Sequence, residues 1–339
     1  MNLNDRRGLK AQTKEILSAT KPGKKRLFAV HIAVSAVVSF VISLLGYLLQ
    51  QGGMAATGLD GISTRALLET LEQLLSMAYS LASPFWQIAG CFLALQLLRQ
   101  APANGRSLLA GFRRVGPVLR WMLLVMLMLT PLAWVGSTIG LFVGIVVAMF
   151  LPSGKIFWEI AMSVPEAATQ EQFLAMVEDP AIEDQLMTAT IPAMVIMVLL
   201  TFVAILPLYY RLRMSQYILM DDANAGARTA IKASFRLTKG SAWALFRLDL
   251  SYWWYYGLEF LLSGLYIAGS ISQALPLSPL MLFLVCNGGY MVGEILLYSL
   301  ANPRVQVTYA GAYEALVEKS QKEAALRMQK VVARTILPQ

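Results

Sequence analysis

Charged residues are scarce in this chain. Only 14% of its 339 residues are Asp, Glu, Lys or Arg, whereas 57% are hydrophobic. A soluble domain usually has about 25% charged residues. The sequence therefore has too few charges to cover a water-facing surface, and this favours an integral membrane protein.

Residues that build metal and catalytic sites are also scarce. The two cysteines, Cys91 and Cys286, lie inside apolar runs and have no metal-ligand spacing around them. The only histidine, His31, cannot build a metal site alone, and we expect it to be a satisfied residue near the membrane interface. The chain also lacks a Ser/His pairing, a His-Glu zinc motif and an intramembrane aspartate pair. We therefore expect no metal, no cofactor and no enzymatic activity.

Long apolar runs dominate what is present. A transmembrane helix needs about 20 predominantly apolar residues. Six segments satisfy this requirement: 27–49, 77–98, 117–151, 189–210, 243–269 and 278–301. The sequence thus predicts an all-α, polytopic helical membrane protein with six transmembrane helices and additional interfacial amphipathic helices.

The basic residues are distributed very unevenly around these segments. Of the 28 lysines and arginines, 26 lie in or just beside alternate connecting segments, beginning with the N-terminal one. Positive residues mark the cytoplasmic side, so both termini are predicted to be cytoplasmic. The net positive charge is therefore explained by membrane topology, and nucleic-acid binding is not needed to account for it. The chain then divides into a basic segment 1–26, a membrane domain 27–301 whose first span is not a cleaved signal, and a cytoplasmic tail 302–339.

The third apolar segment, 117–151, is too long for one upright span, at about 52 Å for a helix. Two short spans hinged at Pro131 and Gly136 are an alternative. They would place the basic segment that follows residue 210 outside, against the positive-inside rule. We therefore interpret the segment as one long helix with a kink near Pro131.

The two longer extracytoplasmic segments differ from each other. Leucines at helical spacing within 50–76 indicate that the second helix begins before the bilayer. Segment 152–188 carries seven acids and one lysine and is predicted to form a small helical cap. Such a cap could attract cations or a basic partner, although a solvated surface is the simpler interpretation.

Segment 224–239 is predicted to form a cytoplasmic amphipathic helix, started by Asn224 and ended by Gly240 in a left-handed turn. Its basic residues share one face: Arg228, Lys232, Arg236 and Lys239. A shorter amphipathic stretch, 107–115, carries Arg113 and Arg114. We expect these residues to contact anionic lipids. The alternative is that any cytoplasmic loop will be basic.

Two carboxylates inside the predicted spans, Glu259 and Glu294, are the best candidates for function, because a buried charge in hydrocarbon is costly unless it is paired or lines a cavity. Each is predicted to share a helix face with other polar residues: Tyr252 and Tyr256 beside Glu259, and Asn287, Tyr290 and Tyr298 beside Glu294. The two faces would meet between the fifth and sixth spans. Alternatively, a tyrosine hydroxyl satisfies each acid. A third acid, Asp249, is expected to pair with Arg247.

Glycines recur every fourth residue at two places. One series is Gly136, Gly140 and Gly144, and the other is Gly289 and Gly293. This spacing allows helices to approach closely. The pattern leaves open whether the contacts lie within one chain or between chains, so it does not define an oligomeric state.

Three stretches resemble a known family. Residues 218–240 run as an apolar stretch, an acidic turn, an Ala-Ile-Lys-x-Ser helix and a Lys-Gly stop, and segments 108–112 and 307–316 match in the expected order. Together they resemble the bacterial integral membrane protein family catalogued as domain-of-unknown-function family 975. The resemblance implies a multi-span helical fold and supplies no activity. It departs at 152–188, where a shorter connection is expected.

We therefore expect a non-enzymatic accessory or lipid-binding protein of the bacterial plasma membrane. Its partners would be anionic lipids of the inner leaflet, with a membrane protein partner left open. The alternative is a transporter or channel for a small solute or lipid that uses the carboxylates between the fifth and sixth spans.

Overall fold

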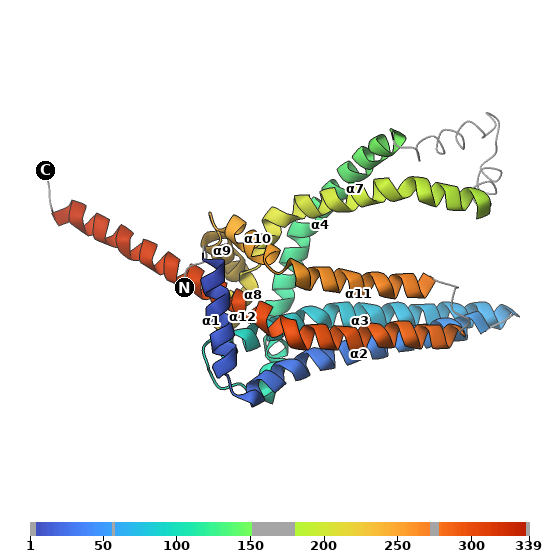
Figure 1. The fold of residues 1–339 in the computed structure, drawn as a ribbon, viewed down its shortest axis with the longest axis horizontal. Coiled ribbons are helices and arrows are strands. Elements are labelled where there is room, and N and C mark those ends of the chain that lie inside the picture. Colours follow the sequence, from blue (N-terminus) through green and yellow to red (C-terminus); the bar gives the residue numbers. More distant parts are fainter. Residues whose placement is uncertain (1–4, 56–57, 151–179, 272–277, 337–339) are drawn as a thin grey trace. The chain divides into compact units, whose positions relative to one another are not determined.

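The computed structural model describes the backbone of residues 5–55, 58–150, 180–271 and 278–336 (Figure 1). These residues form α-helices joined by short turns and two 3₁₀ helices, and contain no β-strand. The chain divides into two compact units, which we describe separately. The first consists of Met1–Met122 and Leu212–Gln339, and the second of Leu123–Arg211.

The first unit is built around four long helices. Of these, α2 packs along α3, and α12 contacts α2, α3 and α11. Shorter helices α1, α8, α9 and α10 gather at one end of these helices (Figure 1). The elements of this unit are α1 (Arg6–Ala19), α2 (Pro22–Ala55), α3 (Gly58–Leu98), η1 (Gly105–Leu109), η2 (Gly111–Arg114), the start of α4 (Val115–Met149), α8 (Ser215–Asp221), α9 (Ala227–Leu237), α10 (Ala242–Leu250), α11 (Trp253–Ile271) and α12 (Pro279–Ile336).

The core of the first unit lies at the end where the short helices gather. Its most completely buried large side chains include Leu9, Leu97, Leu219, Leu245 and Tyr309. Elsewhere, the long helices keep many large apolar side chains exposed, as on α2, where valines and leucines repeat along the outer face. Apolar surface of this extent is unusual on a soluble protein.

Helix α1 shows why the N-terminal segment is folded rather than free. The Asp5 carboxylate accepts a hydrogen bond from the Gly8 amide at 2.9 Å and caps the helix start. Leu9 and Thr13 are buried on the face that meets α12. The Lys10 ammonium donates to the Ser251 carbonyl at 2.7 Å. Burial, with repulsion from Arg6, lowers the pKa of Lys10.

The second unit contains the rest of α4 and most of α7 (Pro180–Leu212). A Cβ atom at Gly140 would lie 2.7 Å from the Met197 Cα, and one at Gly144 would lie 2.6 Å from the Ala193 carbonyl oxygen. Gly136 comes similarly close to α7. This glycine series therefore packs helices within one chain. Helix α4 is also continuous through Pro131, which confirms the prediction of one long helix.

The prediction of a single helix over 243–269 is wrong. The chain breaks between α10 and α11, where the Ser251 amide donates to the Arg247 and Leu248 carbonyls and the Tyr252 amide donates to the Asp249 carbonyl. Among the described residues, five helices are long and apolar enough to cross a membrane: Pro22–Gln51, Thr64–Leu98, Gly111–Met149, Thr190–Asp221 and Pro279–Gln329.

Some helices extend beyond the predicted apolar segments. Helix α12 does not end at residue 301 but continues through Pro303 to Ile336. Its stretch 305–316 is largely buried, so the start of the predicted tail belongs to the core, whereas the described side chains beyond Leu316 are mostly exposed. Helix α3 begins at Gly58, as the early start of the second helix predicted. The predicted cap 152–188 lies outside the described residues up to position 179, and α7 begins at Pro180.

Candidate functional site

A polar cavity of about 280 Å³ lies between α2, α11 and α12. Asn287, Tyr290 and Glu294 of α12 line it, because positions three, four and seven residues apart share one face of a helix. The other helices contribute mainly small hydroxyl and aromatic side chains: Ala36, Ser39, Phe40 and Ser43 from α2, and Ser263 and Tyr266 from α11. Three of the four residues of the predicted polar face of α12 therefore line this cavity, whereas Tyr298 does not.

The two predicted carboxylates have different surroundings. The Tyr298 hydroxyl donates to the Glu259 carboxylate at 2.7 Å, so Glu259 is satisfied by a tyrosine. Glu294 lies in the cavity wall, and no hydrogen bond or ion pair from the described residues reaches its carboxylate. The two acids are close enough to repel each other. Glu294 is thus the carboxylate that the described residues leave without a hydrogen bond, in the wall of the cavity.

Tyr252 does not share a helix face with Glu259, whereas Tyr256 lies three residues before Glu259 in α11, on the same side of the helix. Tyr252 lies in the turn before α11, where its hydroxyl is 2.8 Å from the Thr308 hydroxyl. The Tyr256 hydroxyl donates to the Asp249 carboxylate at 2.8 Å. The expectation failed for Tyr252 because it assumed an unbroken helix through residues 251–252.

Asp249 also has a different partner from the predicted one. Its carboxylate pairs with the Arg213 guanidinium at 2.5 Å, and the two side chains are only 13% and 15% exposed. The Arg213 guanidinium also stacks on the Tyr309 ring, 3.5 Å from its centroid. Arg247 does not take this role, and its Nε is buried without a hydrogen-bond partner among the described residues.

His31 is buried within the protein, with 6% of its surface exposed. Its ring stacks on Trp86 with 4.4 Å between the centroids and 3° between the planes. The Trp86 indole donates to the His31 carbonyl oxygen at 3.2 Å. The His31 side chain forms a hydrogen bond with the backbone of Trp86, whereas its Nδ1 atom has no partner in the described part of the chain, so the expected satisfied histidine is satisfied only in part.

The predicted amphipathic helix is α9. Arg228, Lys232 and Arg236 of α9, and Lys239 in the turn that follows it, are all exposed; we call these four residues the basic face of α9. The opposite side, which includes Ala230, Ile231 and Ser234, is buried against α8 and α12. Gly226 rather than Asn224 precedes the helix, because the Asn224 amide donates to the Asp222 carboxylate in a turn. Gly240 has the predicted left-handed conformation, with φ of 75°.

The second amphipathic stretch forms the 3₁₀ helices η1 and η2 instead of an α-helix. Arg113 is exposed on it. The guanidinium of Arg114 turns inward and donates to four carbonyl oxygens that follow or end α8, namely those of Leu219, Asp222, Ala223 and Ala225. Arg114 therefore holds the turn between α8 and α9. It was predicted as a lipid contact, and only its distant partners in the chain reveal this role.

The second glycine series is not a uniform packing surface. A Cβ atom at Gly293 would lie 2.6 Å from a Leu262 methyl group, so α11 and α12 approach closely there. At Gly289, a Cβ atom would meet no described atom within 4 Å.

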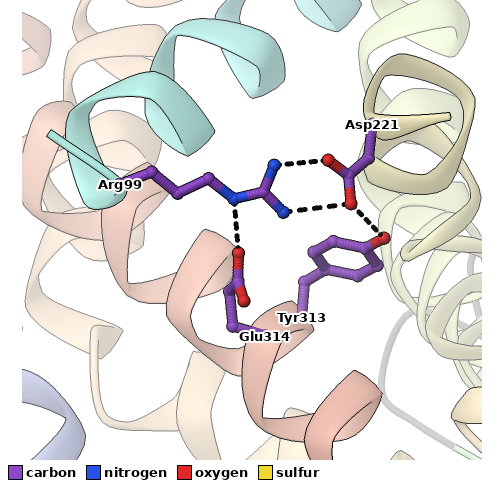
Figure 2. Close-up of polar contacts among 4 residues, drawn as sticks. All are labelled: Arg99, Asp221, Tyr313 and Glu314. Carbon is purple, nitrogen blue, oxygen red and sulfur yellow. Dashed lines mark hydrogen bonds and ion pairs between the residues drawn. The ribbon is translucent and has the colours of Figure 1, made fainter. Parts of the chain in front are cut away.

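A polar cluster not predicted from the sequence joins three helices of the first unit (Figure 2). Arg99 follows α3, and its guanidinium binds both Asp221 carboxylate oxygens, at 2.5 and 3.0 Å, at the end of α8. Its Nε donates to Glu314 of α12 at 2.6 Å. The neighbouring Tyr313 hydroxyl donates to Asp221 at 2.9 Å. We call these four residues the Arg99 cluster.

The Arg99 cluster links two of the stretches that carry the family resemblance. Asp221 belongs to the acidic turn of segment 218–240, and Tyr313 and Glu314 belong to segment 307–316. Hydrogen bonding to Asp221, with a smaller contribution from Glu314, raises the pKa of the Arg99 guanidinium, so the cation is permanent at any physiological pH. The cluster is therefore a fixed structural clamp.

The described residues define an all-helical protein with five helices long and apolar enough to cross a membrane. The family described as Protein of unknown function (DUF975) matches residues 1–320, and the chain belongs to it. No curated protein and no solved structure matches the chain.

Proposed function

We propose that the protein is a non-enzymatic, multi-pass protein of the bacterial plasma membrane that binds anionic lipids through α9. In this proposal both termini lie in the cytoplasm, which the distribution of basic residues favours. The observation that carries the proposal is the exposed basic face of α9, formed by Arg228, Lys232, Arg236 and Lys239.

The geometry of α9 favours headgroup binding over insertion. The apolar side of the helix packs against α8 and α12, so it is not available to enter the acyl chains. Its basic side is fixed in position before any lipid arrives. Each lysine or arginine near an anionic surface contributes about 1 kcal/mol of attraction. A preformed row of four such residues therefore favours anionic headgroups over zwitterionic ones.

Neutralising this face gives the first prediction. Glutamine at positions 228, 232, 236 and 239 together should weaken association with anionic lipids by about 4 kcal/mol in total. Native mass spectrometry of the protein released from mixed anionic and zwitterionic nanodiscs measures retained lipid. The matched control replaces four exposed basic residues outside α9, namely Arg7, Lys14, Lys322 and Arg327. Equal retention of anionic lipid by wild type and the α9 variant would refute the proposal.

A second candidate function is transport of a small solute, favoured by the cavity at Glu294. A carboxylate that lines a cavity between apolar helices is typical of ion and substrate pathways. In proteoliposomes with a pH-sensitive dye inside, the wild type should carry a proton flux that Glu294→Gln abolishes while the variant remains folded. An unchanged flux in the variant would remove this candidate.

An accessory role would require a protein partner. Extraction of the tagged protein directly into native nanodiscs, followed by mass spectrometry, would recover such a partner in stoichiometric amount. Recovery of one enriched lipid and no protein would instead support the lipid-binding role alone.

A further inference from the structure

We propose that the cavity between α2, α11 and α12 binds a protonated amine, with Glu294 as its counter-ion. This site is separate from the lipid-binding face of α9, and it stands whether or not the protein transports anything.

The first argument is charge. The Glu294 carboxylate receives no hydrogen bond or ion pair from the described residues, and Glu259 repels it. A carboxylate removed from bulk water and left unpaired is costly, and a cation in the same cavity removes most of that cost. The cavity therefore favours a positively charged occupant over a neutral or anionic one.

The second argument is the hydrogen-bonding character of the walls. The Asn287 amide nitrogen donates to the Phe283 carbonyl at 3.1 Å, which leaves the amide oxygen as an acceptor. Ser39, Ser43 and Ser263 contribute hydroxyl oxygens to the lining. An ammonium group has three N–H donors and no acceptor. The cavity wall thus offers hydrogen-bond acceptors to the three N–H donors of an ammonium group.

The third argument separates an amine from a metal ion. Calcium takes six to eight oxygen ligands, and magnesium requires an octahedral set in which one or two carboxylates are completed by waters or phosphates. Within the described residues there is no group of three or more His, Cys, Asp or Glu that could hold a metal ion. The cavity instead places aromatic rings beside its carboxylate, with the Tyr266 and Tyr290 centroids 5.3 Å apart and Phe40 on the α2 wall. Aromatic faces attract ammonium groups through the ring quadrupole.

The size of the cavity restricts the ligand further. At about 280 Å³ it lies at or below the lower end of the range for drug-sized ligands. An ammonium group on a short alkyl chain fits this volume. The same chemistry is present in a soluble primary amine and in the ethanolamine headgroup of a lipid, so the test must distinguish these two sources.

Binding of ethylammonium to the full-length protein tests the site. Isothermal titration in nanodiscs made only of phosphatidylglycerol, which contain no amine headgroup, should give saturable binding to the wild type. Glu294→Gln should weaken the affinity by about tenfold or more, because it removes one partner of a desolvated charge pair. Glu323→Gln removes the same charge from the exposed end of α12 and should change the affinity by less than about twofold.

A second variant keeps the test decisive if Glu294→Gln does not fold. Ser39→Leu fills the cavity from α2 and leaves Glu294 intact, so it should abolish saturable binding by blocking the space. Binding to Ser39→Leu with wild-type affinity would overturn the proposal. So would the absence of saturable binding to the wild type, or equal affinity of wild type and folded Glu294→Gln.

The source is resolved in nanodiscs that contain phosphatidylethanolamine. If the headgroup is the ligand, native mass spectrometry should find phosphatidylethanolamine retained by the wild type and lost from Glu294→Gln, and soluble ethylammonium should displace it. If a soluble amine is the ligand, ethylammonium should bind with the same affinity whether or not phosphatidylethanolamine is present. Both outcomes support the amine site and assign its source.

Discussion

Replacing Gly111 with alanine should destabilise the first unit by about 1–3 kcal/mol, the usual cost of overpacking a close contact. The added methyl group would collide with the carbonyl group of Phe85 in α3. Because the neighbouring atoms belong to the backbone of a long helix, they cannot move aside as a flexible side chain would. Thermal unfolding in detergent micelles, followed by tryptophan fluorescence, measures the effect.

Gly116 provides the matched control. It lies five residues further on, in the first turn of α4, and a Cβ atom there would meet no described atom within 4 Å. Alanine at this position should leave the unfolding temperature unchanged or raise it slightly, since alanine favours helix more than glycine does. Equal unfolding temperatures for the two variants would show that 3₁₀ helix η2 does not pack on α3 as closely as described.

Replacing Arg114 with methionine should also destabilise the first unit, by about 2 kcal/mol or more. The substitution leaves four carbonyl oxygens around the end of α8 without their guanidinium donor, and hydrogen bonds to a charged group are worth about 1.5–3 kcal/mol each before solvent replaces them. Arg113→Met removes the same charge from an exposed neighbour and should have little effect. Chemical unfolding in micelles compares the two variants.

Replacing Arg114 with lysine tests whether the positive charge or the hydrogen-bond geometry of the guanidinium stabilises the turn. Lysine keeps the positive charge but has no planar fork to reach carbonyls of several different residues. Lysine should therefore recover only a minor part of the stability lost in Arg114→Met. Full recovery by lysine would mean that charge alone, and not the hydrogen-bonded fork, stabilises the turn between α8 and α9.

The features that could be predicted from the sequence are those with a short repeat. The face of Asn287, Tyr290 and Glu294, the glycines spaced by four and the basic face of α9 all follow from the period of a helix, which is a local property. The long helix through Pro131 followed from the distribution of charge. These patterns located the main wall of the cavity.

The partners of charged residues could not be predicted in this way. Asp249 was assigned to Arg247 because the two are close in sequence, but residues two apart on a helix point in different directions. Its actual partner, Arg213, comes from a segment 36 residues away. The Arg99 cluster is still less local, since Arg99 and Asp221 are 122 residues apart. Neither the composition nor the residue spacing of the sequence indicates which distant charged residues pair.

The break in the helix at residues 251–252 could not be predicted for a related reason. Neither glycine nor proline marks the break, and the apolar pattern runs through it. Part of what stabilises the turn is the Lys10 ammonium of α1, which binds the Ser251 carbonyl from a distant part of the chain. Conversely, the apolar pattern ends at residue 301, yet α12 continues through Pro303, and the buried packing of residues 305–316 offsets the backbone hydrogen bond that proline cannot make.

The continuity of α12 has a mechanical consequence. Glu294 in the cavity wall and Glu314 in the Arg99 cluster are twenty positions apart on this helix, about 30 Å along its axis. A helix resists stretching because its hydrogen bonds would have to lengthen together. A shift of α12 along its axis near Glu294 would therefore have to displace the buried stretch 305–316 and the Arg99–Glu314 ion pair together.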